Sequence, residues 1–210
     1  FGTERRALMR YEELPPHLVE AFVAAEDERF FSHGGIDLFG LARAALNLAL
    51  TGQKAQGGST ITMQLARNVF LSSEKTYTRK FREILLAQAI EAELSKEEIL
   101  ELYLNKIFLG ERAYGVGAAS RVYFNVPPEA LSLAQAATLA GLPKAPSRDN
   151  PIANPQRALE RRNYVLGRMA DAGFIDSAAR EDARAEAMVV SPYRPTLDLD
   201  AHYAVEMARA

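Results

Sequence analysis

The sequence predicts an all-α domain, and three features support this fold class. Capping boxes, in which a serine is followed three residues later by Glu or Gln, occur at Ser95–Glu98 and Ser132–Gln135. Glycine and proline interrupt the chain at spacings that suit helices. The alternating polar and apolar pattern of half-buried strands is nearly absent.

The first expected helices each follow a local start signal. Pro15–Pro16 precedes an apolar, alanine-rich segment, and the break at Gly34–Gly35 precedes a second apolar segment. Ser59 or Thr60 is the expected N-cap of the third helix, and Ser72–Ser73 the expected start of the fourth and longest. These helices are predicted over residues 17–25, 38–50, 60–70 and 72–94, with a polar loop over 51–56.

The remaining helices carry stronger signals. Two begin at the capping boxes, and a third begins at Asn154, an N-cap residue followed by proline at the first helical position. Their predicted ranges are 95–105, 132–141, 155–173 and 176–187. The tail over 191–210 contains Pro192 and Pro195 and is predicted to be a linker or the start of a following domain.

The composition excludes or disfavours several classes of function. The 210 residues, of which 48% are hydrophobic and 25% charged, suit one globular domain. A net charge of −2 and a pI of about 6.0 argue against nucleic acid as a partner. The absence of cysteine excludes disulfides and thiol catalysis, and the three scattered histidines do not suit a zinc site. No apolar run reaches the roughly 18 residues of a membrane span.

A first candidate cluster runs from Glu26 to Gly35. Glu26 follows an apolar stretch and precedes the aromatic pair Phe30–Phe31, so desolvation is expected to raise its pKa, as a general base near neutral pH requires. On composition alone, an acidic run that merely solvates a helix end is the commoner explanation.

A second cluster runs from Gly57 to Asn68. Two glycines and the hydroxyls of Ser59 and Thr60 stand at a helix start, where free N–H groups favour anions, and Gln64 and Arg67 follow on the same face. A phosphate-binding site and an ordinary capped helix are equally compatible with this pattern. It is not a nucleotide P-loop, because the Lys-Ser/Thr ending is missing.

A third cluster comprises Arg79, Lys80 and Glu83 on one helical face. Two cations would hold the carboxylate ionised, although a surface ion-pair ladder is the commoner explanation of such spacing. Together, one carboxylate able to take a proton, one held charged, and a cationic pocket suggest glycosyl transfer from a phosphate-activated sugar.

These clusters resemble the motifs of glycosyltransferase family 51, the peptidoglycan glycosyltransferase domain of class A penicillin-binding proteins and monofunctional transglycosylases. The matching motifs are Glu-Asp-x-x-Phe-x-x-His-x-Gly at 26–35, Gly-x-Ser-Thr-Ile-Thr-x-Gln-x-x-x-Asn at 57–68, Arg-Lys-x-x-Glu at 79–83, and the fourth motif at Lys96, Ile99, Leu100, Glu101, Tyr103, Leu104 and Asn105. The stretches 112–119 and 141–147 also look like this family. Met63 stands where many members carry Gln, and Arg67 where Lys is common.

The resemblance covers residues 1–190 and implies a lysozyme-like, bilobed helical domain with a main lobe and a small membrane-associated lobe. The small lobe would include Leu38–Leu50, a segment that from sequence could equally be a buried core helix. The implied reaction polymerises lipid II into β-1,4-linked GlcNAc-MurNAc strands with inversion and releases undecaprenyl pyrophosphate.

By analogy with the family, Glu26 is the general base and Glu83 the second catalytic carboxylate, positioning the cations or assisting the phosphate through a divalent ion such as Mg or Mn. The implied substrate-binding residues are Asp27, Phe30, His33, Ser59, Thr60, Gln64, Arg67, Asn68, Arg79 and Lys80. For His33, bracing the loop is the slightly favoured alternative. No metal ligand is assigned.

The resemblance also implies partners and a location. The partners would be lipid II, the growing glycan strand, the cytoplasmic membrane and other cell-wall synthesis proteins. The domain would lie at the outer or periplasmic face of the bacterial inner membrane, with an N-terminal anchor outside this sequence. Two alternatives stay open: a lysozyme-like or lytic transglycosylase-type enzyme that cleaves glycan, and an inactive membrane scaffold.

Overall fold

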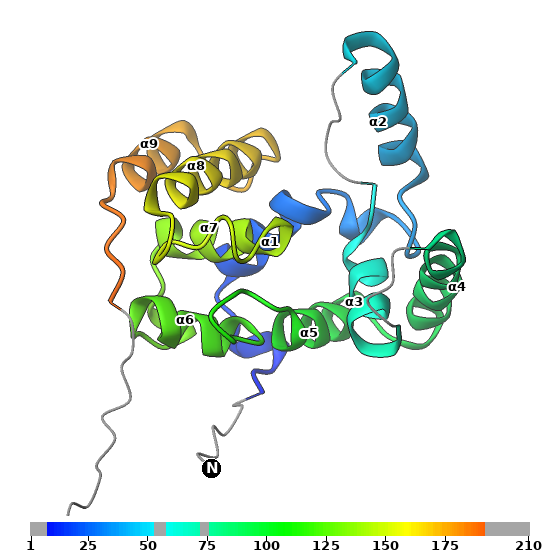
Figure 1. The fold of residues 1–210 in the computed structure, drawn as a ribbon, viewed down its shortest axis with the longest axis horizontal. Helices are drawn as coiled ribbons and strands as arrows, with labels where there is room; N and C mark the ends of the chain where they lie inside the picture. The colour runs from blue at the N-terminus through cyan, green and yellow to red at the C-terminus, as the bar shows by residue number, and fades with distance from the viewer. Residues whose placement is uncertain (1–7, 53–57, 72–75, 192–210) are drawn as a thin grey trace, which may run out of the picture.

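The predicted all-α class is confirmed. The computed structural model describes residues 8–52, 58–71 and 76–191, and in these ranges the chain forms nine α-helices and four short 3-10 helices (Figure 1). The same ranges hold no strand beyond an isolated antiparallel bridge between Phe108 and Tyr114.

The helices are α1 (Pro16–Glu26), α2 (Leu38–Thr51), α3 (Ile61–Phe70), α4 (Tyr77–Glu93), α5 (Lys96–Lys106), α6 (Val116–Phe124), α7 (Leu133–Gly141), α8 (Pro155–Asp171) and α9 (Ser177–Ala185). The 3-10 helices are η1 (Tyr11–Glu13), η2 (Phe30–Ser32), η3 (Pro128–Ala130) and η4 (Leu142–Lys144).

Helix α1 lies at the centre of the core. Most of its side chains are apolar and buried, with Leu18 and Phe22 fully so, as expected of a helix packed against several others. It packs against α7 and α8, while α3 packs against both α4 and α5 (Figure 1). The final residue of this buried helix is Glu26, so the core itself fixes where that carboxylate stands.

The capping predictions are largely confirmed. Thr60 caps α3 by accepting from Met63 N (3.2 Å), and both predicted capping boxes form at the starts of α5 and α7. The fourth helix does not run unbroken over 72–94, because Thr76 is extended and caps α4, which begins at Tyr77; the predicted start at 72–73 lies outside the described ranges. Asn154 precedes α8 but makes no side-chain cap.

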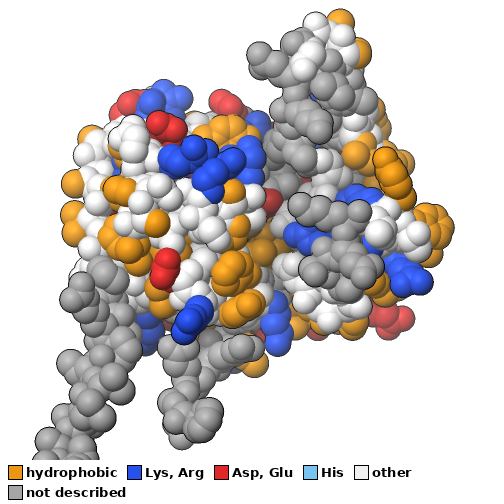
Figure 2. Space-filling view, viewed as in Figure 1, with side chains coloured by type: hydrophobic (Ala, Val, Ile, Leu, Met, Phe, Trp, Pro, Cys, Tyr) orange, Lys and Arg blue, Asp and Glu red, His pale blue; other side chains and the backbone are white. Residues whose placement is uncertain are grey.

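Helix α2 stands away from the rest of the molecule (Figure 1). Its apolar side chains are exposed: Leu38, Phe39, Leu46 and Leu50 are each more than 60% accessible. Exposed apolar side chains also gather over the outer side of α4 (Figure 2). The alternative that residues 38–50 form a buried core helix is therefore wrong. None of the described helices is long and apolar enough to cross a membrane.

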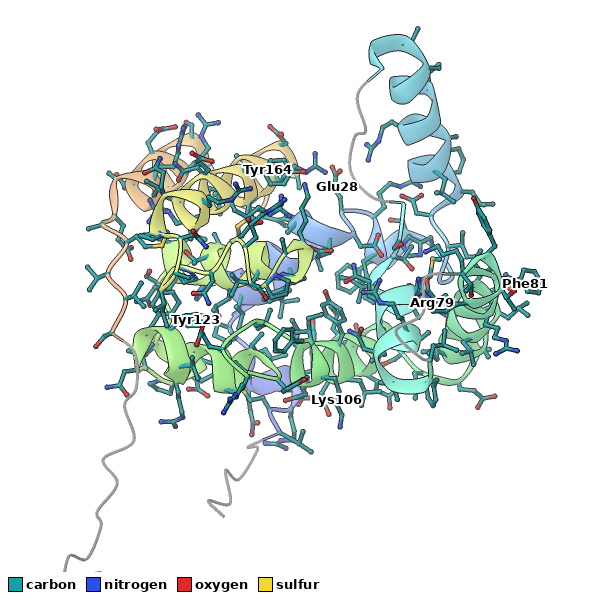
Figure 3. The ribbon with its side chains drawn as sticks, viewed as in Figure 1. Glu28, Arg79, Phe81, Lys106, Tyr123 and Tyr164 are labelled. Atoms are coloured by element: carbon teal, nitrogen blue, oxygen red, sulfur yellow. The ribbon has the colours of Figure 1, made fainter. Side chains whose placement is uncertain are left out.

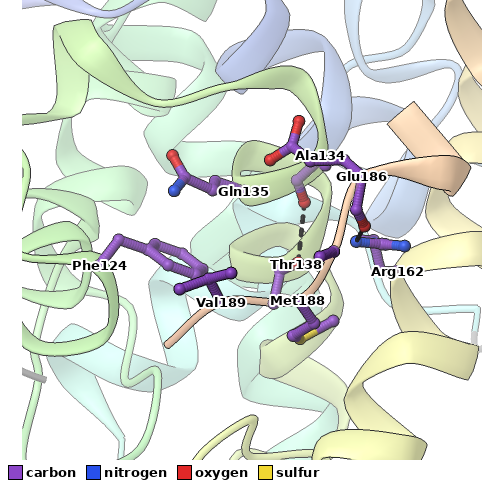
Figure 4. Close-up of a pocket in the computed structure, with 9 residues that line it drawn as sticks. Phe124, Ala134, Gln135, Thr138, Arg162, Glu186, Met188 and Val189 are labelled. Atoms are coloured by element: carbon purple, nitrogen blue, oxygen red, sulfur yellow. Dashed lines mark hydrogen bonds between the residues drawn. The ribbon is translucent and has the colours of Figure 1, made fainter. Parts of the chain in front are cut away.

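The chain leaves α9 as a strap, residues 187–191, that returns across α7 toward α6. Arg162 of α8, almost fully buried, donates to the carbonyls of Arg184 (2.9 Å) and Glu186 (2.8 Å), and Ser191 N donates to Tyr123 O (3.0 Å). Beneath the strap lies a cavity of about 210 Å³ (Figure 4). The strap is thus held at both ends.

Replacing Gly115 by alanine is expected to destabilise the fold by about 2 kcal/mol or more. Gly115 has φ +83°, and an added Cβ would lie 2.7 Å from the backbone oxygen of Asn105. Gly167→Ala is the matched control, since nothing lies within 4 Å of its added Cβ, and alanine favours a helix interior by about 1 kcal/mol. In urea denaturation, the midpoint should fall for Gly115→Ala and rise for Gly167→Ala. Equal changes in the two midpoints would contradict the conformational constraint at Gly115.

Candidate active site

Glu26 is partly buried where α1 ends. Its Oε2 accepts a hydrogen bond of 2.8 Å from Gln64 Nε2 on α3. Burial raises the pKa of the Glu26 carboxyl above its ordinary value. The Gln64 hydrogen bond and the nearby cations Arg161, Arg67 and Lys144 oppose this rise without cancelling it. Glu26 therefore has the raised pKa predicted from its apolar neighbours.

Three contributors to this environment were not predicted as site residues. Arg161 of α8 donates to Gly141 O (3.2 Å) and stacks on Tyr164, and Lys144 of η4 is exposed. Tyr103 of α5 is fully buried and donates to Gln64 Oε1 (3.3 Å). They lie 77 to 135 residues from Glu26 in sequence, so only tertiary packing reveals them. Lys and Arg side chains gather over α8 in Figure 2.

Asp27, Phe30 and His33 support the turn after α1. Asp27 accepts from Ile61 N at the start of α3 (3.0 Å) and pairs with His33 Nε2 (2.9 Å). Phe30 has no exposed surface and lies under the Lys96 ammonium, 4.3 Å from its ring centre. A substrate could not reach Phe30 without displacing its neighbours. These contacts favour a bracing role for the trio.

The start of α3 connects the first two clusters. Thr60 Oγ1 donates to Gly35 O (2.6 Å), joining the N-cap of α3 to the glycine that ends the first motif. Two residues further on, Thr62 Oγ1 donates to Glu91 of α4 (2.5 Å). The helix entrance predicted for an anion is thus held in place from two sides.

The third cluster lies against this entrance. Glu83 is 1% exposed and accepts hydrogen bonds from both Arg79 and Lys80 (3.0 Å for the lysine). Lys80 Nζ also donates to Ser59 Oγ (2.7 Å), which joins α4 to the start of α3. In Figure 3 Arg79 points toward α3, whereas Phe81, two residues on, points away from the body. A surface ion-pair ladder does not describe this buried carboxylate.

A divalent ion does not fit Glu83, because both carboxylate oxygens already face cations. No group of three or more His, Asp or Glu side chains suited to a metal occurs in the part of the chain that the structure describes. Arg67 is partly buried near Glu26, and Asn68 is exposed on the next residue of α3. Asn68 makes no side-chain hydrogen bond to a described residue.

The structure thus brings the three clusters together around α3. Gln64 of α3 donates to Glu26, and the start of α3 contacts the first loop through Thr60 and through the bond from Ile61 N to Asp27. Ser59, just before α3, accepts from Lys80 of the basic cluster. A carboxylate of raised pKa beside anchored cations suits a transferase that acts on a phosphate-activated donor.

Comparison with known proteins identifies this class. The family model described as Transglycosylase matches residues 1–170. The chain belongs to this family, the peptidoglycan glycosyltransferase domain of class A penicillin-binding proteins.

The relatives are proteins named penicillin-binding protein 1A. Those of Pseudomonas aeruginosa and Escherichia coli are 50% and 49% identical to the whole of this chain, which covers 26% and 25% of their lengths. The crystal structure of penicillin-binding protein 1A from Haemophilus influenzae is 30% identical, with a TM-score of 0.56, over 100% of this chain and 21% of that one. The chain thus spans about a quarter of the length of the curated relatives it matches.

Proposed function

We propose that this domain polymerises lipid II into β-1,4-linked GlcNAc-MurNAc strands by an inverting reaction. The observation that carries the proposal is the Glu26 carboxylate, raised in pKa and oriented by Gln64 from the same helix whose entrance holds the basic cluster. The test is to incubate the full-length protein with labelled lipid II in detergent, where glycan ladders would support the proposal. Absence of glycan ladders when the folded protein is also assayed in a membrane preparation would contradict it.

In the proposed reaction, Glu26 takes the proton from the 4-hydroxyl of the acceptor GlcNAc. That oxygen attacks the anomeric carbon of the donor MurNAc as the bond to the pyrophosphate oxygen breaks, so the α-linked donor gives a β link. A carboxylate of raised pKa is a stronger base than an ordinary glutamate, because base strength follows pKa.

The leaving undecaprenyl pyrophosphate would be met by Arg79, Lys80 and Arg67. Lys80 has one N–H beyond those given to Ser59 and Glu83. Glu83 holds both cations at the start of α3, whose N–H groups add a positive potential. We assign Glu83 to positioning these cations, with Ser59, Thr60 and Asn68 lining the donor side.

This basic cluster favours transfer over the two alternatives. A lysozyme-like enzyme that cleaves neutral glycan has no pyrophosphate to bind and no need for two cations on a buried carboxylate. A scaffold has no need for a carboxyl group whose charged form is disfavoured by burial, as that of Glu26 is. Release of muropeptides from purified cell wall would favour cleavage instead.

We further propose a bilobed arrangement at the membrane. The main lobe would comprise α1 and α5–α9, and the small lobe α2–α4, whose exposed apolar side chains would enter the lipid surface from the periplasmic side. The membrane-bound lipid II and growing strand, and the other proteins of cell-wall synthesis, would be the partners.

Replacing Leu46 and Leu50 together by serine is expected to weaken binding to lipid vesicles about tenfold or more, since each leucine buried is worth about 1.5–3 kcal/mol. The two side chains lie one turn apart on α2 and are 61% and 76% exposed. Vesicle co-sedimentation measures the effect. Leu102→Ser on α5, at a side chain 39% exposed, is the control, and equal binding by all variants would contradict a membrane role for α2.

A further inference from the structure

Two consecutive hydrogen bonds connect Tyr103, in the core, to Glu26 through Gln64. Tyr103, fully buried on α5, donates from its hydroxyl to Gln64 Oε1 (3.3 Å), and Gln64 Nε2 donates to Glu26 Oε2 (2.8 Å). Gln64 is itself 6% exposed. Three helices, α5, α3 and α1, therefore meet through these side chains at the carboxylate.

We propose that Tyr103 is a positioning residue: by donating to Gln64 Oε1 it fixes the amide with its nitrogen toward Glu26 and so sets the orientation of the carboxylate. This inference rests on the proposed role of Glu26 as general base and adds a residue that touches no substrate.

The amide of Gln64 has two different ends, a donor nitrogen and an acceptor oxygen. A glutamine side chain can rotate by half a turn, which exchanges its donor nitrogen and its acceptor oxygen. With the nitrogen toward Glu26, the amide donates to the carboxylate, whereas the reversed amide would set oxygen against oxygen. In the first orientation the Tyr103 hydroxyl donates to the amide oxygen while the amide nitrogen donates to Glu26, so both ends of the amide are paired and the tyrosine holds the orientation that the carboxylate requires.

The hydroxyl keeps that proton across the working pH range. Burial, followed by the nearby Glu26, raises the pKa of Tyr103 well above its ordinary value, so the phenol stays a donor. Phenylalanine would preserve the edge-on packing against Phe22, whose ring centre lies 6.2 Å away. The substitution Tyr103→Phe therefore removes the hydroxyl while preserving the aromatic packing.

Other charges around Glu26 would remain in the variant. Arg67 of α3, Arg161 of α8 and Lys144 of η4 all act on the carboxylate, and Asp27 acts on Tyr103. Because these groups are unchanged, a shift in the acid limb of the pH profile would report the loss of donation from Gln64. That donation lowers the pKa of Glu26, so its loss moves the acid limb to higher pH.

The experiment compares Tyr103→Phe with Tyr123→Phe in the full-length protein. Tyr123 is also fully buried, and its hydroxyl donates to Leu109 O (2.8 Å), away from Glu26. For Tyr103→Phe we expect kcat for lipid II to fall about tenfold, KM to change by less than about twofold, and the acid limb of kcat/KM to move up in pH. Tyr123→Phe should keep the parent profile.

Repeating Tyr103→Phe in a Gln64→Met background tests whether Tyr103 acts through Gln64. Methionine keeps the length of the side chain without its amide, so the tyrosine change should then have no further effect. A tenfold loss that persists there, or matching profiles for Tyr103→Phe and Tyr123→Phe, would overturn the proposal. Full activity in Glu26→Gln would instead overturn the proposed function.

Discussion

Glu26→Gln is expected to lower polymerisation of lipid II by about 10³-fold or more while leaving the protein folded. The amide cannot take the proton of the acceptor hydroxyl. Its oxygen can still accept from Gln64 Nε2, which in the parent protein donates to Glu26 Oε2. Turnover of labelled lipid II by the full-length protein measures the loss. Substrate binding should change far less than kcat.

The same substitution should make the fold more stable at neutral pH, by about 1 kcal/mol. The pKa of Glu26 is raised by burial, so its protonated form suits the fold better than its charged form. Its contribution to stability is therefore greatest at low pH and falls as pH rises through the raised pKa. Glutamine keeps the neutral state at every pH.

Two outcomes would contradict this assignment of Glu26. Retained turnover would show that another group is the base. A fall in melting temperature at pH 7 would show that the carboxylate is stabilised by its neighbours rather than desolvated. In the parent protein, activity should fall at acid pH, with its midpoint above the ordinary pKa of a glutamate because Glu26 must be ionised to act.

Glu83→Gln is the second change with a large expected effect, this time on both stability and activity. Glu83 is 1% exposed and neutralises Arg79 and Lys80. Removing the negative charge leaves the two cations close together, and we expect the free energy of unfolding to fall by about 3 kcal/mol. Misplaced cations should also lower kcat about 100-fold.

Glu93→Gln on the same helix is the matched control for Glu83. Glu93 is exposed, and its substitution should stay within about 0.5 kcal/mol of the parent. Urea denaturation and lipid II turnover measure the two effects. Equal stability of the two variants would mean that Glu83 belongs to a surface ion-pair ladder after all.

The sequence predicted most helices because their signals are local. Ser95 and Ser132 carry capping boxes that act within four residues, and the structure forms both. Helix α6 was not predicted, since it begins after Gly115 and has no side-chain cap. The sequence predicts a helix start at Ser72–Ser73, whereas α4 begins at Tyr77 after Thr76, because serine and threonine are both good N-caps and local sequence does not choose between them.

The sequence indicates candidate residues for the site, but not the contacts that connect them. The family motif implies that Gln64 binds substrate, whereas in the structure its amide donates to Glu26. Tyr103 belongs to the fourth motif and Arg161 to none of the motifs, but in neither case does the local sequence indicate proximity to Glu26. Only the packing of α3, α5 and α8 around the end of α1 determines these contacts.

The strap after α9 also has a mechanical consequence. A pull on the chain beyond Ser191 would first load the hydrogen bond from Ser191 N to Tyr123 O, and then the two bonds from Arg162 to the carbonyls of Glu186 and Arg184. These anchors belong to α6 and α8. Because α8 also packs against α1 and its Arg161 acts on Glu26, tension taken up by Arg162 would be transmitted to the helices that surround the catalytic carboxylate.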